Sequence, residues 1–148
     1  MKTVDGGKTV TQASPTPASS ALIVLLDLAI DPRQPTHLYG VRQDGTLSTS
    51  VDGGQTWATL GNGLPQGSVR GIVAGPAAGS TSQPAPLYAA TAQGVYASFD
   101  NGATWATLGS GLADTSALTV SVDPNHGTVY AGVEGAGGLF VLMPAAAP

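Results

Sequence analysis

The eight-residue stretch SVDGGQTW at residues 50–57 returns almost unchanged as SFDNGATW at residues 98–105, a spacing of 48 residues. A more divergent copy, TVDGGKTV at residues 3–10, precedes the first by 47 residues. Such even spacing indicates a repeat protein in which each period is one small structural unit. The 148 residues therefore hold three periods of about 48 residues.

Each copy is predicted to end one strand, form a tight turn and begin another strand. The Asp carboxylate accepts hydrogen bonds from nearby backbone N–H groups, and the Gly two positions later supplies a positive φ angle. The Trp that ends two of the copies buries a large apolar face, about 150–250 Å². The residues assigned this structural role are Asp5, Gly7, Ser50, Asp52, Gly54, Thr56, Trp57, Ser98, Asp100, Gly102, Thr104 and Trp105.

The pattern Ser/Thr-x-Asp-x-Gly-x-Thr-Trp resembles the Asp box, or BNR repeat, and the resemblance covers the whole chain at the level of repeats. Families that carry the box include sialidases, sortilin-like receptors, xyloglucan hydrolases and photosystem assembly factors. The resemblance implies an all-β fold, a β-propeller with blades of four antiparallel strands. It also implies that each box joins the third and fourth strands at the rim, away from the ligand-binding face, and is structural.

The chain is interpreted as one Asp-box propeller domain over residues 1–148, with repeats at 8–55, 56–103 and 104–148 plus 1–7. Apolar and β-branched runs separated by Gly, Pro, Asn and Asp predict the strands. They are expected at 8–13, 21–30, 37–42, 46–51, 56–60, 68–74, 87–91, 95–99, 104–108, 117–122, 128–133 and 139–142.

The continuous apolar run at residues 21–30 is predicted to be an innermost strand that is buried on both faces. A buried helix is the alternative, and the β-branched residues and the following Asp31-Pro32 favour the strand. Three tyrosines recur at one point of the second strand in each repeat. We expect Tyr39, Tyr88 and Tyr130 to pack between blades rather than to form a sugar-binding platform.

The last repeat has three predicted strands, and the fourth strand of that blade is expected from residues 8–13. Three blades are too few for one ring, because propellers use about four to eight. We therefore expect a C2 homodimer that forms a six-bladed ring, in which the N-terminal strand of each copy completes the last blade of the other. A larger ring or an open filament is the alternative.

The composition excludes several functions. The net charge is −4, with five Lys and Arg residues, so no basic surface for nucleic acid or for an anionic membrane is expected. There is no cysteine, which excludes disulfides and thiolate metal sites. The longest apolar run has ten residues and is too short to cross a bilayer.

These features leave the cellular compartment open. The apolar run is poorly placed for a signal peptide, and an extracellular origin is compatible with the sequence. A fragment, an engineered protein and a small natural protein that assembles are the three expected origins. The ring size, if it is not six blades, also stays open.

The sequence predicts no enzyme activity. A sialidase needs three arginines around a carboxylate, a Tyr–Glu pair and an Asp acid, whereas this chain has three Arg and a single Glu. Arg33 is expected in a turn on the box side, away from the other two. Paired-carboxylate glycosidase chemistry, with Asp44 and Asp114 on the loop side, is the minor alternative.

A ligand site, if present, is expected where the loops between strands two and three meet the loops that lead into each next blade. The candidate residues are Asn62, Gln66, Arg70, Asp114, Arg42, Asp44 and Glu134. Their partner is expected to be a glycan or a protein loop. The functions considered are a self-assembling, non-catalytic scaffold or binding module, a lectin-like propeller, and a fragment of a larger glycosidase or receptor.

No cofactor and no metal site are predicted. His37 and His126 are expected near the turn between the first and second strands of their repeats, and they lack further partners for zinc. Both are expected to be exposed turn residues.

Overall fold

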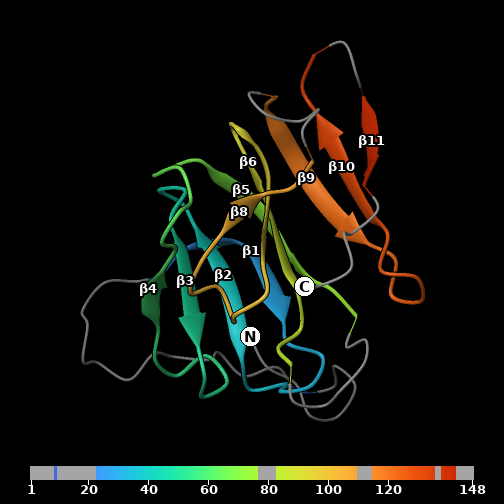
Figure 1. Cartoon of the computed structure of the whole chain (residues 1–148). Coiled ribbons are helices and arrows are strands. Elements are labelled where there is room, and N and C mark those ends of the chain that lie inside the picture. The colour runs from blue at the N-terminus through green and yellow to red at the C-terminus, as the bar shows by residue number, and fades with distance from the viewer. Residues whose placement is uncertain (1–8, 10–22, 77–82, 110–114, 136–137, 143–148) are drawn as a thin grey trace.

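The structure is a computed structural model that describes residues 9, 23–76, 83–109, 115–135 and 138–142. In these residues the regular elements are antiparallel strands that form three sheets (Figure 1). The first sheet has the order β1 (Leu25–Ile30), β2 (Leu38–Arg42), β3 (Leu47–Ser50) and β4 (Ala58–Leu60). The second has β5 (Val69–Ala74), β6 (Leu87–Thr91), β7 (Gly94–Ser98) and β8 (Ala106–Thr107).

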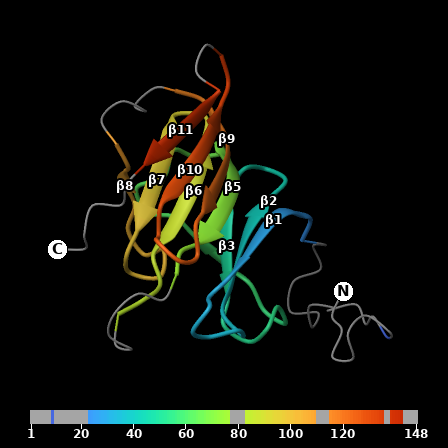
Figure 2. The same cartoon turned by 90° about the vertical axis from the view of Figure 1, so that its right-hand side faces the viewer.

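The third sheet has β9 (Ala117–Val122), β10 (Val129–Val133) and β11 (Leu139–Leu142), with β10 in the middle. All three sheets follow the chain in order, so each is one repeat folded as a meander. Figure 2 shows the sheets side by side, and β5 contacts β1 on one side and β9 on the other. The all-β prediction and the order of strands are therefore confirmed, apart from the segments outside the described residues.

Each first strand carries one extra residue relative to its partner strand. The register with the second strand shifts between Leu25 and Asp27, between Val69 and Gly71, and opposite Gly132 and Val133. Such a bulge bends and twists the strand. The extra residues are Leu26, Arg70 and Leu118, and all three are exposed.

The core lies between the sheets. One cluster joins Tyr39, Val41 and Leu47 of the first sheet to Ile72 and other residues of the second. A second cluster joins the second sheet to the third in the same manner, and its members include Tyr88, Val95, Val120 and Val129. Packing between neighbouring sheets therefore forms the apolar core of the described residues.

The recurring tyrosine shows how this packing is arranged. Tyr39 pairs with Ala29, Tyr88 with Val73 and Tyr130 with Ser121, so the three occupy one register position. Tyr39 and Tyr88 are each 1% exposed, whereas Tyr130 is 37% exposed. The predicted packing between sheets is confirmed for the first two, and the third lies on a face that no described residue covers.

Two apolar faces that no described residue covers lie at the two ends of the row of sheets. We call the face of the first sheet that carries Leu28, Ile30 and Trp57 the leading face. We call the face of the third sheet that carries Tyr130, Leu139 and Val141 the trailing face. Leu28, Ile30, Leu139 and Val141 are between 47% and 64% exposed.

The prediction that residues 21–30 are buried on both faces is wrong. The strand begins at Leu25, and Leu26, Leu28 and Ile30 are exposed while Ala29 is buried. The reason is that, among the described strands, β1 meets another sheet on one side, through β5. The continuous apolar pattern correctly indicated a strand but not the absence of a neighbour on its leading face.

Several features predicted from the sequence lie outside the described residues. They are the expected fourth strand at 8–13 (apart from Thr9), the residues Asp5 and Gly7 of the first sequence copy, and Asp114. The third sheet accordingly has β11 as its last described strand.

Candidate functional site

The turn between β3 and β4, residues 50–57, is organised by one carboxylate. Asp52 Oδ1 accepts hydrogen bonds from Ser50 Oγ at 2.7 Å and from the backbone N–H groups of Gln55 and Thr56 at 2.9 Å. Asp52 Oδ2 accepts the Thr56 hydroxyl at 2.5 Å. We call this segment the first turn repeat.

Residues 98–105, the second turn repeat, form the same network between β7 and β8. Asp100 Oδ1 accepts from Ser98 Oγ at 2.7 Å and from the Thr104 N–H at 2.9 Å, and Oδ2 accepts the Thr104 hydroxyl at 2.5 Å. The Trp105 indole donates to the Gly102 carbonyl at 3.0 Å, as Trp57 donates to Gly54 at 3.1 Å. The predicted strand–turn–strand arrangement is confirmed at both positions.

The turn repeats need residues that accept a left-handed backbone. The φ angles are +72° and +91° at Gly53 and Gly54, and +59° and +83° at Asn101 and Gly102. Asn is the non-Gly residue that adopts this region most readily, which is why it replaces the first Gly without changing the turn. The strands that follow begin at Ala58 and Ala106, two residues later than predicted, because Thr56 and Thr104 are held by the carboxylates.

The hydrogen bonds keep both carboxylates ionised. The Thr56 hydroxyl and N–H, together with Ser50, lower the pKa of Asp52 to about 2. Partial desolvation opposes ionisation of Asp100, but the bonds from Thr104 and Ser98 outweigh it and its pKa is also lowered. Carboxylates whose oxygens are already engaged in this way stabilise a turn and are poorly suited to proton transfer.

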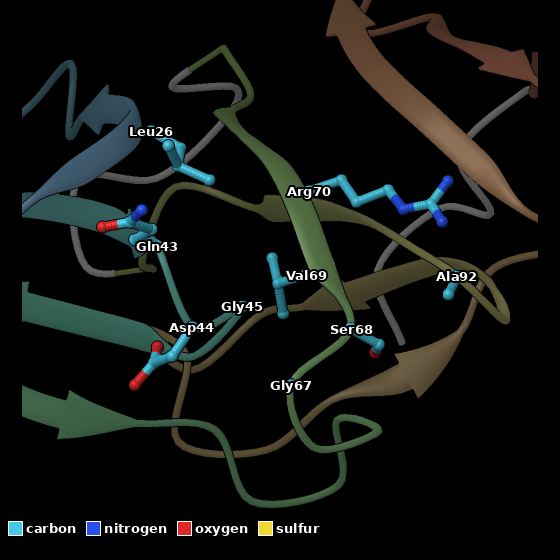
Figure 3. A pocket seen from close by; sticks show the side chains of 9 residues that line it. All are labelled: Leu26, Gln43, Asp44, Gly45, Gly67, Ser68, Val69, Arg70 and Ala92. Carbon is cyan, nitrogen blue, oxygen red and sulfur yellow. The ribbon is translucent and has the colours of Figure 1, made fainter.

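The opposite ends of the strands form a second set of loops, around a shallow cavity of about 380 Å³. The hairpin turn at 43–45 and the segment 67–70 line it, with Leu26 and Ala92 at its edges (Figure 3). The two loops touch closely, because a Cβ atom on Gly45 would lie 2.5 Å from the Gly67 carbonyl. The Val69 N–H also donates to the Gly45 carbonyl at 3.1 Å.

Two charged groups at this cavity point in different directions. Asp44 is held by Thr46, whose hydroxyl and N–H donate to Oδ1 at 2.6 and 3.0 Å, and these bonds lower the pKa of Asp44. Arg70 extends toward β9, drawn orange, and away from Asp44 (Figure 3). Its Nη1 donates to Ser116 Oγ at 2.7 Å and lies 3.5 Å from Glu134 Oε2.

The predicted ligand-binding residues are thus only partly brought together. Arg70 meets Glu134, and Asp44 lines the same cavity as Arg70 but on another side of it. Gln66 lines an adjoining cavity of about 180 Å³ between the first sheet and the 61–67 loop. Asn62 lies elsewhere, paired with Thr104 of the second turn repeat. Arg42 is half-buried, and its Nε is buried without a hydrogen-bond partner in the described part of the chain.

Sequence reasoning missed two residues that join the sheets. Asp27 Oδ2 accepts the Ile72 N–H at 2.9 Å and so connects the first strands of the first and second sheets. Ser116 lies between Arg70 and Glu134 and donates to Glu134 Oε2 at 3.1 Å. The signal for Asp27 was visible, because it is the single charged residue in an apolar run of ten.

The two histidines differ from each other. His126 is exposed and its Nδ1 lies 2.6 Å from Asp123 Oδ2, as expected for a turn residue. His37 is half-buried and its Nε2 shares a hydrogen bond with Thr49 Oγ1 at 3.1 Å, so its predicted exposure is wrong. The described residues contain no cluster of three or more His, Cys, Asp or Glu side chains placed to hold a metal ion.

No protein-family model and no curated protein matches the chain. Several solved structures, however, are similar to it. The GH74 xyloglucanase from Xanthomonas campestris is similar with a TM-score of 0.62 and 22% identity, over 78% of this chain and 20% of that one. The extracellular domain of BT4673 from B. thetaiotaomicron has a TM-score of 0.60 and 17% identity, over 85% and 16%. YCF48 from Cyanidioschyzon merolae has a TM-score of 0.56 and 17% identity, over 82% and 37%.

These similar proteins are all β-propellers, and the likeness identifies the three sheets as consecutive blades of a β-propeller. At such identities it establishes the fold alone. The chain spans between 16% and 37% of the length of these three structures. Among the described residues, no helix is long and apolar enough to cross a membrane.

Proposed function

We propose that this protein is a non-catalytic β-propeller scaffold, and that two copies joined head to tail form a ring of six blades. The proposal rests on one observation, the unequal exposure of equivalent residues in the three blades. Residues that are buried in the middle blade are exposed at the two ends of the row. Since propellers use about four to eight blades, three are too few and six are within the range.

The leading face supports the proposal because its counterpart in the middle blade is an interface. Leu28 in the first blade is equivalent to Ile72 in the middle blade, because each pairs with the third residue of the second strand. Leu28 is 47% exposed, whereas Ile72 is 4% exposed because it packs against the first blade. Trp57 is half-buried, while its counterpart Trp105 is 7% exposed in the same interface.

The trailing face supports it in the same way. Val95 and Ala97 of the middle blade are 1% and 5% exposed beneath the third blade. Their counterparts Leu139 and Val141 are 64% and 57% exposed. The trailing face thus resembles the surface on which a next blade packs, and the leading face resembles a blade that packs there. In the proposed ring, a second copy of the chain covers both faces.

The proposal also includes a strand that pairs with the outer edge of β11. We assign residues 3–10 and the two turn repeats to the Asp-box class, and residues 8–13 to the outer strand of the last blade. In a ring of two copies, each N-terminal strand then pairs with β11 of the other copy. Unpaired strand edges recruit such strands.

The carboxylates favour a binding scaffold over a glycosidase. Glycoside hydrolysis requires one carboxyl group with a raised pKa to protonate the leaving group. Bonds from Thr46 instead lower the pKa of Asp44, and Glu134 is engaged by Arg70 and Ser116. Glycan or protein binding at the loop face remains the related proposal, and a glycan array on the assembled protein tests it.

The mass in solution tests the ring. Light scattering after size exclusion at micromolar concentration should give twice the chain mass of 14.6 kDa. Tyr130→Asp and Leu28→Asp should give monomers, because each places a charge in the new interface. Phe99→Asp is the matched control, since Phe99 is 42% exposed although its blade has neighbours on both sides. A compact wild-type monomer would contradict the ring and favour a section of a larger propeller.

A further inference from the structure

Neighbouring blades touch at both ends of their interface. At the end with the turn repeats, Leu60 of the first blade lies so close to Gly102 of the second that a Cβ atom on this glycine would overlap Leu60 Cδ2. At the loop face, the extra residue in the first strand of one blade lies beside the following blade. We call these extra residues the bulge residues, and they are Leu26, Arg70 and Leu118.

The residues that a bulge residue faces also recur in every blade. In each blade, the backbone N–H directly after the second strand donates to the carbonyl directly before the first strand. The three pairs, at 3.1, 3.1 and 2.9 Å, are Gln43 with Val24, Ala92 with Ser68 and Glu134 with Ser116. We call each of them a receiving pair. The receiving pairs hold equivalent places in their blades and differ in their side chains.

Between the second and third blades, the bulge residue and the receiving pair have complementary chemistry. Arg70 Nη1 donates to Ser116 Oγ at 2.7 Å and lies 3.5 Å from Glu134 Oε2. Ser116 Oγ donates to the same carboxylate oxygen at 3.1 Å. A cation therefore faces an anion, and a hydroxyl group joins the two.

Between the first and second blades, the same positions hold smaller or apolar side chains. Leu26, Ser68 and Ala92 line the cavity of about 380 Å³, and Figure 3 shows Leu26 and Ala92 on opposite sides of it. The two interfaces have the same backbone arrangement here. The side chains of the bulge residue and the receiving pair therefore decide whether the loop face is bridged or open between two blades.

We infer that, in the ring, Leu118 of each copy packs against the receiving pair of Val24 and Gln43 in the other copy. No other described blade follows Leu118 or precedes Val24, and their side chains are 49% and 51% exposed. Gln43 is exposed and carries no charge. This contact rests on the proposed ring, and it gives each junction between copies an apolar contact where Arg70 and Glu134 form an ion pair within the chain.

Moving the ion pair to the junction tests the contact. Leu118→Arg alone should raise the dimer dissociation constant about tenfold, because it replaces an apolar contact with a charge that lacks a partner. Adding Gln43→Glu recreates the pairing of Arg70 with Glu134 between two copies and should recover about fivefold, an effect that should shrink as salt is raised. A double-mutant cycle separates this coupling from the effect of each change alone.

Three further variants control the test. Leu26→Arg makes the same change at the equivalent position that faces a blade of the same chain, so the dissociation constant should stay near the wild-type value. Leu118→Glu with Gln43→Glu places like charges at the junction and should show coupling of the opposite sign. Leu118→Glu with Gln43→Lys reverses the ion pair and should restore the favourable coupling, so the test does not depend on the folding of one variant.

Sedimentation equilibrium measures the dissociation constants, and circular dichroism checks the fold of each variant. Favourable coupling for opposite charges and unfavourable coupling for like charges would support the contact. A dimeric wild-type protein in which positions 43 and 118 show no coupling would overturn the contact and leave the ring standing. A monomeric wild-type protein would contradict the ring and the contact together.

Discussion

The middle blade and the first blade have nearly the same sequence pattern but different surroundings. Trp105 and Ile72 are buried at 7% and 4% exposure, while Trp57 is half-buried and Leu28 is 47% exposed. The turn that precedes each Trp has the same Ser–Asp, Thr–Asp and Trp–Gly hydrogen bonds in both blades. A turn repeat therefore folds from its own residues, whereas the core of a blade depends on the neighbouring blade.

Removing a tyrosine between two blades should destabilise the protein most. Tyr88→Ala should lower the free energy of unfolding by about 3–5 kcal/mol, because it empties a fully buried site between two blades. Tyr130→Ala should cost far less at concentrations where the protein is monomeric, since Tyr130 is 37% exposed. Urea unfolding of both variants measures the difference, and equal losses would contradict the assignment of Tyr130 to an uncovered face.

A methyl group on Gly102 is expected to have the next largest effect. Gly102→Ala should lower the free energy of unfolding by about 2–4 kcal/mol, from overpacking against Leu60 and from left-handed strain. Gly53→Ala introduces similar strain at φ +72° but meets no atom within 4 Å. Chemical denaturation should show a clearly smaller loss of unfolding free energy for Gly53→Ala than for Gly102→Ala. The reverse order would contradict the contact between Gly102 and Leu60.

The hydrogen bond from Ile72 to Asp27 should contribute less. Asp27→Ala leaves the Ile72 N–H without its acceptor and should lower the free energy of unfolding by about 1–2 kcal/mol. Asp27→Asn keeps an oxygen acceptor and should restore most of the loss. Hydrogen exchange at the Ile72 amide is the direct readout, and unchanged protection in Asp27→Ala would count against this bond.

The smallest effect concerns acid stability. The folded pKa of Asp52 is about 2, below its ordinary value of 3.8. Its ionised form therefore stabilises the fold at pH values above about 4, and this contribution is lost as the pH falls from about 4 through 2. Asp52→Asn should be less stable than wild type at pH 7 and should show a shallower loss in that window, as followed by circular dichroism.

Much of the fold was predictable because the turn chemistry is local. The carboxylate, the glycine and the threonine of each turn repeat lie within eight residues, and three strands, β6, β9 and β11, have the predicted bounds. The predicted burial of residues 21–30 was wrong because burial depends on which blade lies beside the strand. The local pattern marks Asp27 as a lone charge in an apolar run, but its partner, the Ile72 N–H, lies 45 residues away and could not be identified from that pattern.

The loop face was predictable only in part, for a similar reason. Spacing placed Arg70 and Glu134 on one side of the blades, and the structure joins them through Ser116. Spacing did not indicate that the backbone after β4 turns toward Thr104 and carries Asn62 with it. The positions of long loops follow from contacts with the neighbouring blade more than from their own residues.

The bulge in every first strand decides what the middle of a closed ring contains. First strands border the central channel of a propeller, and the extra residues there are Leu26, Arg70 and Leu118. Two copies would contribute four leucines and two arginines to the bore. In the proposed ring the leucines would make part of the channel wall apolar, whereas each Arg70 is held by Ser116 and Glu134.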